Sequence, residues 1–124
     1  MSRSKGKAKR KQLHGDFLKQ TEGIGNLAGS DLIVVNPEHF AVALTYDASR
    51  MSAPTVRAKA RNRLALAMRS EAARLNIPVV ADPPLARSLF KSARPGSEIA
   101  SEHYAEVARH YSALRARQTE NAPT

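Results

Sequence analysis

Cysteine and tryptophan are both absent from the 124 residues of this chain. The lack of cysteine excludes a disulfide framework, a thiolate nucleophile and a cysteine-ligated zinc or iron–sulfur centre. No apolar run approaches the roughly 18 residues that a membrane-spanning helix requires, and no secretory signal peptide precedes the polar N-terminal stretch. We therefore expect a soluble chain with one small aliphatic core, because 42% of its residues are hydrophobic but only 5% are aromatic.

The signature sequences of the common enzyme classes are also missing. The chain has no G-x-x-x-x-G-K-[ST] phosphate loop, no G-x-G-x-x-G dinucleotide fingerprint, no H-E-x-x-H zinc motif and no G-x-S-x-G nucleophile elbow. His103 and His110 share one face of a predicted helix, but two ligands without a third make a poor metal site. We expect no metal, no cofactor and no conventional turnover enzyme.

Positive charge is concentrated near the N-terminus. The chain carries 20 Lys and Arg against 11 Asp and Glu, a net charge of +9, and residues 1–30 hold 7 of the basic but only 2 of the acidic side chains. Residues 1–30 are therefore predicted to be a basic arm and linker, either solvated or helical. Such an arm attracts an anionic membrane surface or nucleic acid, or only maintains solubility. We expect no nucleic-acid partner, because no basic strand carries the aromatic side chains that RNA-binding modules use.

The hydropathy pattern predicts an ordered domain over residues 31–117 and a disordered tail over 118–124. Strands are predicted over 32–35, 40–46, 55–61 and 77–80, where β-branched runs or a period of two occur. Helices are predicted from Asn62, the expected N-cap, to near Asn76, after Asp82 and from Ser101. Strands separated by helices indicate an α/β fold, with a mixed sheet of about four strands surrounded by about four helices.

Apolar and basic residues alternate along the strand predicted over 55–61. The period of two places Val56, Ala58 and Ala60 on one face, and Arg57, Lys59 and Arg61 on the other. This basic face either is solvated or contacts a partner.

The segment that carries chemistry is Asn36-Pro37-Glu38-His39, which joins two strands that are expected to pair. Asn and Pro are common turn residues, so an ordinary tight turn is one interpretation. Self-cleavage is the other. Pro37 has no N–H with which to attack the Asn36 side chain, so deamidation by that route is closed. The Asn36 amide nitrogen can instead attack its own main-chain carbonyl, form a succinimide and expel Pro37 as a free amine.

An amide is a weak nucleophile, so this cyclisation needs a turn that holds a near-attack geometry and a donor for the developing oxyanion. His39 is close enough in sequence to take a proton from the Asn36 amide or deliver one to the Pro37 nitrogen. We predict catalytic roles for Asn36, Pro37 and His39 in a single-turnover reaction.

Four segments carry recognisable motifs: LIVVNPEHFAVALTY at 32–46, APTVRAKA at 53–60, IPVVADPPLARSLFK at 77–91 and GSEI at 96–99. In order and spacing they resemble the FlhB/YscU family of export-apparatus switch proteins, over about residues 31–115. The resemblance implies a mixed sheet wrapped by helices and a cut between Asn and Pro of an N-P-T-H loop. It places those roles on Asn36 and Pro37, with His39 assisting.

The resemblance also implies a function. Family members switch the substrate specificity of flagellar or virulence type III secretion, at the cytoplasmic side of the bacterial inner membrane. The implied partners are other export-apparatus proteins, secreted substrates and the chain's own cleaved fragment, held noncovalently. The sequence leaves open which of the two systems is involved, and whether this is an excised domain or a stand-alone relative.

Three positions or segments depart from the family pattern. Glu38 replaces the family's Thr and puts a carboxylate beside the reacting amide, where it either supports a protonated His39 or repels the oxyanion. Ala60 replaces a glycine, which a regular strand end tolerates. The family's transmembrane portion is missing. The alternative function is therefore a non-cleaving relative that docks export substrates or gate components.

Overall fold

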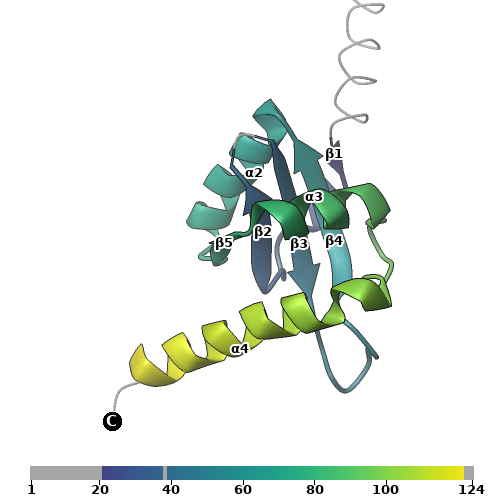
Figure 1. Cartoon of the computed structure of the whole chain (residues 1–124). Coiled ribbons are helices and arrows are strands. Elements are labelled where there is room, and N and C mark those ends of the chain that lie inside the picture. The colour runs from purple at the N-terminus through teal and green to yellow at the C-terminus, as the bar shows by residue number, and fades with distance from the viewer. Residues whose placement is uncertain (1–20, 38, 122–124) are drawn as a thin grey trace, which may run out of the picture.

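The computed structural model describes residues 21–37 and 39–121 (Figure 1). The elements, in chain order, are β1 (Thr21–Glu22), the 3-10 turn η1 (Ile24–Asn26), β2 (Leu32–Asn36), β3 (Phe40–Thr45), β4 (Thr55–Arg61), α2 (Arg63–Arg74), β5 (Val79–Ala81), α3 (Pro83–Ser92), the 3-10 turn η2 (Ser101–His103) and α4 (Tyr104–Asn121). None of the helices in these described ranges is long and apolar enough to cross a bilayer.

The strands form one mixed sheet in the order β1-β4-β3-β2-β5. β2 pairs antiparallel with β3 on one edge, where Val34 lies opposite Val42, and parallel with β5 on the other, where Val34 lies opposite Val80. A parallel pair requires a crossover, and α2 supplies it between β4 and β5. The predicted α/β fold with a mixed sheet is confirmed.

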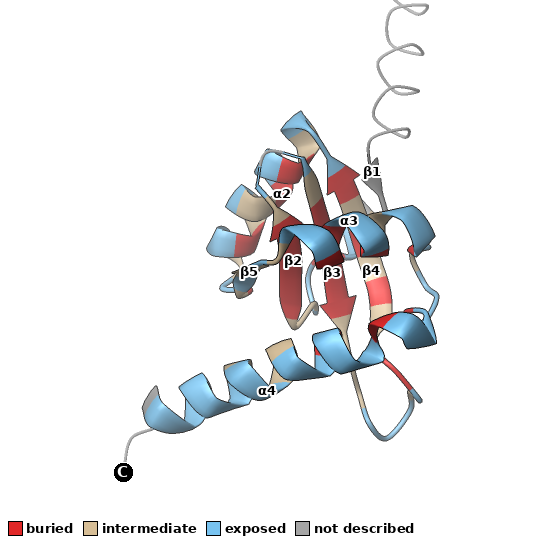
Figure 2. Cartoon of the chain, in the orientation of Figure 1, coloured by how far each residue is buried: buried red, intermediate tan, exposed pale blue. Residues whose placement is uncertain are grey.

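Helices cover both faces of this sheet (Figures 1 and 2). α3 and the first turns of α4 bury Leu85, Leu89 and Val107 against one face, and α2 buries Met68 and Ala72 against the other. The result is a three-layer domain with an apolar cluster on each side of the sheet. Both faces of the central strands are therefore shielded from water, which explains why β2 is a continuous apolar run.

The sheet begins earlier in the chain, and the last helix ends later, than the sequence pattern predicts. Residues 21–30, predicted to belong to the arm and linker, contain β1 and η1, and the Leu27 side chain is buried. Pairing with β4 holds the two residues of β1, a tertiary contact that local composition does not reveal. Residues 1–20, with the basic stretch, lie outside the described residues. α4 continues to Asn121, so residues 118–121 are helical and not part of a disordered tail.

The prediction that Val56, Ala58 and Ala60 share one face of β4 is wrong. The register against β3 shifts between Ala43 and Leu44, so that Val56 lies opposite Leu44 while Ala58 lies opposite Ala43. An extra residue in one strand reverses the alternation at that point. Val56 therefore packs with the α3 side of the core, and Ala58 and Ala60 pack with the α2 side.

The basic side chains of β4 are largely used within the domain. The Arg57 side chain donates hydrogen bonds to the carbonyls of Asn26 at 2.6 Å and Ala28 at 2.8 Å. Lys59 donates to the carbonyl of Phe90 at 3.2 Å, and its ammonium lies 4.7 Å from the centre of the Phe90 ring. Only Arg61 of the three is exposed. Two of these cations thus fix η1 and α3 to the sheet.

Leu44→Ala should lower the free energy of unfolding by about 2–5 kcal/mol, because it leaves a cavity at a side chain with no exposed surface. Urea unfolding followed by circular dichroism measures this loss. Leu66→Ala, at a side chain that is 45% exposed, should change stability by no more than about 0.5 kcal/mol. Equal losses in the two variants would contradict the described core.

Candidate functional site

The predicted self-cleavage segment forms the turn of the β2–β3 hairpin. Asn36 is the last residue of β2 and pairs with Phe40, the first residue of β3. Asn36 is half-buried, whereas Pro37 and His39 are exposed. The structure thus brings Asn36, Pro37 and His39 together at one tip of the sheet. Glu38 lies outside the described residues.

A backbone donor already contacts the carbonyl that cyclisation would attack. The His39 N–H donates a hydrogen bond to the Asn36 carbonyl oxygen at 2.9 Å, which closes a four-residue turn. That oxygen is the atom on which negative charge develops when the Asn36 amide nitrogen attacks. Sequence reasoning assigned only a side-chain role to His39 and missed this backbone role, although the hydrogen bond from residue i+3 to residue i is the usual closure of such a turn.

The His39 imidazole does not occupy a proton-transfer position in this structure. Its ring centre lies 6.4 Å from that of Phe40, and within the described part of the chain no hydrogen bond joins it to the Asn36 side chain. Hydrogen bonds of catalytic groups are often long or absent before the reacting geometry forms. The observed contact between His39 and Asn36 is therefore the one through the backbone.

Three contacts, two from α3 and its cap and one from the start of α2, hold the two strand ends beside this turn. The Val35 carbonyl accepts the N–H of Asp82, the residue that caps α3, at 2.9 Å. The Phe40 ring stacks on Phe90 of α3 with ring centres 4.8 Å apart. The Asn62 N–H, at the start of α2, donates to the His39 carbonyl at 2.8 Å. The turn thus projects from a rigid base.

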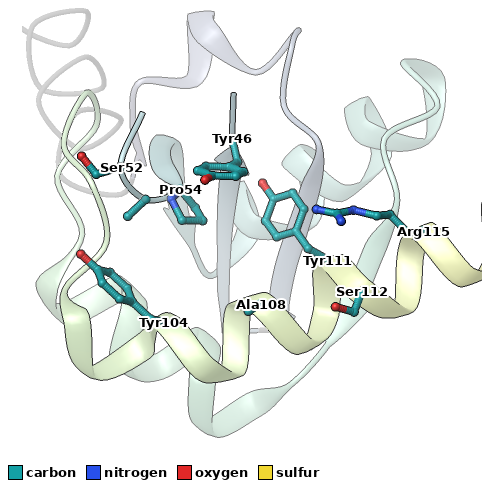
Figure 3. A pocket seen from close by; sticks show the side chains of 9 residues that line it. Tyr46, Ser52, Pro54, Tyr104, Ala108, Tyr111, Ser112 and Arg115 are labelled. Atoms are coloured by element: carbon teal, nitrogen blue, oxygen red, sulfur yellow. The ribbon is translucent and has the colours of Figure 1, made fainter. Parts of the chain in front are cut away.

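A second feature, a groove of about 260 Å³, lies at the opposite end of β3 (Figure 3). Its walls include Tyr46 and Pro54, at the two ends of the β3–β4 loop, and Tyr104, Ala108 and Tyr111 from α4. These side chains are separated by about half of the chain in sequence, so the hydropathy pattern gave no sign of the groove. Its lining is more apolar than polar, which suits an apolar side chain better than a charged one.

One carboxylate fixes the wall of this groove. Asp31 Oδ2 accepts the N–H of Tyr46 at 2.7 Å and the phenol O–H of Tyr111 at 3.0 Å. Burial raises the pKa of Tyr111 well above its ordinary value, and the neighbouring Asp31 charge raises it further. The hydroxyl consequently stays protonated and donates, which ties α4 to the start of β2.

His103 and His110 do not converge on a common ligand. His103 is buried with its Nε2 3.7 Å from Glu102, whereas His110 Nε2 lies 2.8 Å from Asp82 Oδ2. In the ranges that the structure describes, no cluster of three His, Asp or Glu side chains could hold a metal ion. The His110 contact instead joins α4 to the N-terminus of α3.

Fold and turn together define a class of protein: a small α/β domain whose two central strands are joined by an exposed Asn-Pro turn. The family model described as the FlhB HrpN YscU SpaS Family matches residues 3–114. The chain belongs to this family, which confirms the resemblance drawn from its motifs.

Individual relatives agree with this assignment. The flagellar biosynthetic protein FlhB of Escherichia coli (strain K12) is 47% identical over 79 residues, which cover 64% of this chain and 21% of that protein. The cytoplasmic domain of FlhB from Shewanella putrefaciens superposes with a TM-score of 0.72 at 33% identity, covering 82% of this chain and 81% of that one. The chain thus spans about a fifth of the full-length FlhB relative that it matches.

Structures of mutated EscU C-terminal domains are also similar. The domain in which an Asn is replaced by Ala has a TM-score of 0.66 and 34% identity, covering 69% of this chain and 86% of that one. Two others carry Ala in place of the Pro that follows this Asn and in place of a His two residues beyond that Pro. The same spacing separates Asn36, Pro37 and His39 here.

Tyr111→Phe should lower the free energy of unfolding at neutral pH by about 1–2 kcal/mol, because a hydrogen bond to a carboxylate is lost. The wild type should also lose stability as pH rises above about 10, where the phenol ionises in the unfolded chain but not in the folded one. Urea unfolding at neutral and alkaline pH measures both effects. The Tyr111→Phe variant should lose less stability over the alkaline range, and Tyr104→Phe, at an exposed side chain, should behave like the wild type.

Proposed function

We propose that this chain is the cytoplasmic switch domain of a type III protein-export apparatus, and that it cuts itself once between Asn36 and Pro37. The observation that carries this proposal is the hairpin turn, in which Asn36 is half-buried, Pro37 is exposed and the Asn36 carbonyl already accepts a backbone N–H. Membership of the export family supports the cellular role.

The proposed reaction balances without a cofactor or added water. The Asn36 side-chain nitrogen forms a bond to the Asn36 main-chain carbonyl carbon, and the His39 N–H stabilises the oxyanion. The tetrahedral intermediate collapses by breaking the bond to the Pro37 nitrogen. One proton leaves the attacking amide, and one reaches that nitrogen. The products are a C-terminal succinimide on residues 1–36 and a free secondary amine at Pro37.

The side chain of His39 is the proposed proton carrier for both steps, because a neutral imidazole has one nitrogen that accepts a proton and one that donates. It lies two residues from the leaving nitrogen in an exposed turn, where a rotamer change does not disturb the core. Glu38 remains a proposed modulator of the reaction through the charge that it adds beside this amide.

Several contacts would keep the two pieces together after the cut. β2, in the first piece, is paired on both edges with strands of the second piece. Asp31 bonds to Tyr46 and Tyr111, and Arg57 bonds to the carbonyls of Asn26 and Ala28, so polar contacts also cross between the pieces. Cleavage therefore changes the exposed hairpin tip while the buried core stays assembled.

A change confined to the surface is what a switch between partners requires. Before the cut, the tip is a closed loop, and afterwards it offers two chain ends with different shape and charge. We propose that other parts of the apparatus bind the cut and uncut tips differently. This difference would change the accepted class of exported substrate, at the cytoplasmic side of the bacterial inner membrane. The proposed partners are other export-apparatus proteins and secreted substrates, and an anionic membrane surface for the basic arm.

Intact mass under denaturing conditions tests the chemistry. The freshly purified wild type should convert to two pieces, residues 1–36 and 37–124, whereas Asn36→Ala should remain one chain because it lacks the nucleophile. The first piece should initially be one water lighter than the free acid, which identifies the succinimide and excludes hydrolysis by a contaminating protease.

His39→Ala separates the two roles of His39. This variant keeps the backbone N–H that contacts the Asn36 carbonyl but loses the imidazole, so cleavage should slow by about 10²-fold without being abolished. An unchanged rate would show that the side chain carries no proton, and complete loss would show that the backbone donor alone contributes little.

The groove supports the alternative function, a non-cleaving module that docks export substrates or gate components. Its tyrosine and proline walls suit an apolar side chain from an extended segment of an exported protein. A wild type that stays intact for days at neutral pH would favour this alternative over self-cleavage. The groove is remote from the turn, so docking does not depend on the cut.

A further inference from the structure

Asn62 has a backbone conformation that side-chain-bearing residues rarely adopt. Its φ is 58° and its ψ is −132°, close to the first central residue of a type II′ turn, a conformation that Gly, Asn and Asp adopt far more often than other residues. Asn62 directly precedes α2, but its side chain makes no capping hydrogen bond and is exposed. Asn62 thus occupies the expected N-cap position, but its side chain does not cap the helix and does not account for the strained backbone.

Two backbone hydrogen bonds account for it instead. The Asn62 N–H donates to the His39 carbonyl at 2.8 Å, and the Asn62 carbonyl accepts the N–H of Ala65 at 3.0 Å. The first bond extends the β3–β4 pairing to the hairpin turn, and the second begins α2. Asn62 therefore ends a strand pairing through its N–H and begins a helix through its carbonyl. The chain must change direction abruptly between these two groups, and the positive φ allows it to do so.

This residue links the cleavage turn to a rigid part of the core. α2 is held by Ala65, Met68 and Ala72, all buried against the sheet. Asn62, at the start of α2, donates its N–H to the His39 carbonyl. His39 in turn donates its own N–H to the Asn36 carbonyl oxygen. The position of the oxyanion donor therefore depends on where Asn62 holds His39.

We propose that Asn62 is a positioning residue for cleavage: its left-handed backbone fixes the His39 N–H against the carbonyl that Asn36 attacks. This inference rests on the proposed self-cleavage and assigns a part in it to a residue outside the turn. The packing of α2 and the pairing of β3 with β4 maintain the strain, which is the circumstance in which strained residues persist at functional sites.

Substitutions of Asn62 test the proposal through the cleavage rate. Glycine adopts the observed conformation freely, so Asn62→Gly should cleave within about twofold of the wild-type rate. Alanine disfavours it, so Asn62→Ala should turn the N–H away from His39 and slow cleavage about tenfold or more, since small misplacements have large effects on rate. The rates are measured by denaturing mass at a temperature where melting curves show every variant to be folded.

Asn76→Ala is the matched control. Asn76 also has a positive φ, 59°, but lies just beyond the other end of α2, far from the turn in the hydrogen-bonded network. Its replacement by alanine also places a residue other than Gly or Asn at a positive φ, so it should lower stability without changing the cleavage rate. Equal slowing in Asn76→Ala and Asn62→Ala, or no slowing in either, would overturn the proposal.

Hydrogen exchange of the His39 amide in uncleaved protein gives a second readout. In Asn36→Ala, this amide should be protected, and adding Asn62→Ala should accelerate its exchange at least tenfold, while adding Asn62→Gly should not. If the wild type never cleaves, the proposed function fails, but this comparison still decides whether Asn62 holds His39. Unchanged exchange in the double variant would overturn the positioning role even if the wild type cleaves.

Discussion

The rest of the structure depends on the position of β2 in the sheet. This strand is paired on both edges, with β3 and β5, and is buried on both faces, with Leu32 and Val34 toward α3 and Ile33 and Val35 toward α2. Its apolar run is thus enclosed by paired strands on both edges and by apolar side chains on both faces. Removing β2 would expose both apolar clusters at once, so it cannot leave the sheet without unfolding of the domain.

A strand held in this way can tolerate a break in the chain at its end. The Asn36-Pro37 bond lies just beyond the last pair of the β2–β3 ladder, and Pro37 and His39 are exposed. The positive φ of Asn62 and the backbone hydrogen bond from His39 to Asn36 both restrict the conformation of this turn. The domain therefore combines a packed core, which would retain both pieces after the proposed cut, with an exposed turn at which that cut would change the surface. That combination suits a single irreversible event better than repeated turnover.

The sequence predicted those features that arise from local pattern. The alternation from Phe40 to Thr45 and the Asn-Pro pair predicted the hairpin and its turn, and linked motifs predicted the family. Features that depend on distant contacts were missed. A register shift beside Leu44 moved Val56 to the other face, although the alternation of β4 reads as unbroken. Asn is favoured at helix N-caps, so the sequence predicts that position for Asn62, but its positive φ follows from backbone bonds to both His39 and Ala65, and the distant bond to His39 leaves no sequence signal.

The central claim is that cleavage at the turn leaves β2 in the sheet. The most direct test applies native mass spectrometry and amide hydrogen exchange to the fully cleaved protein. We expect one noncovalent complex that contains residues 1–36 and 37–124, with the amides of Ile33 and Val35 as protected as they are in uncleaved Asn36→Ala. Dissociation of the pieces without denaturant, or rapid exchange along β2 in the cleaved complex, would contradict it.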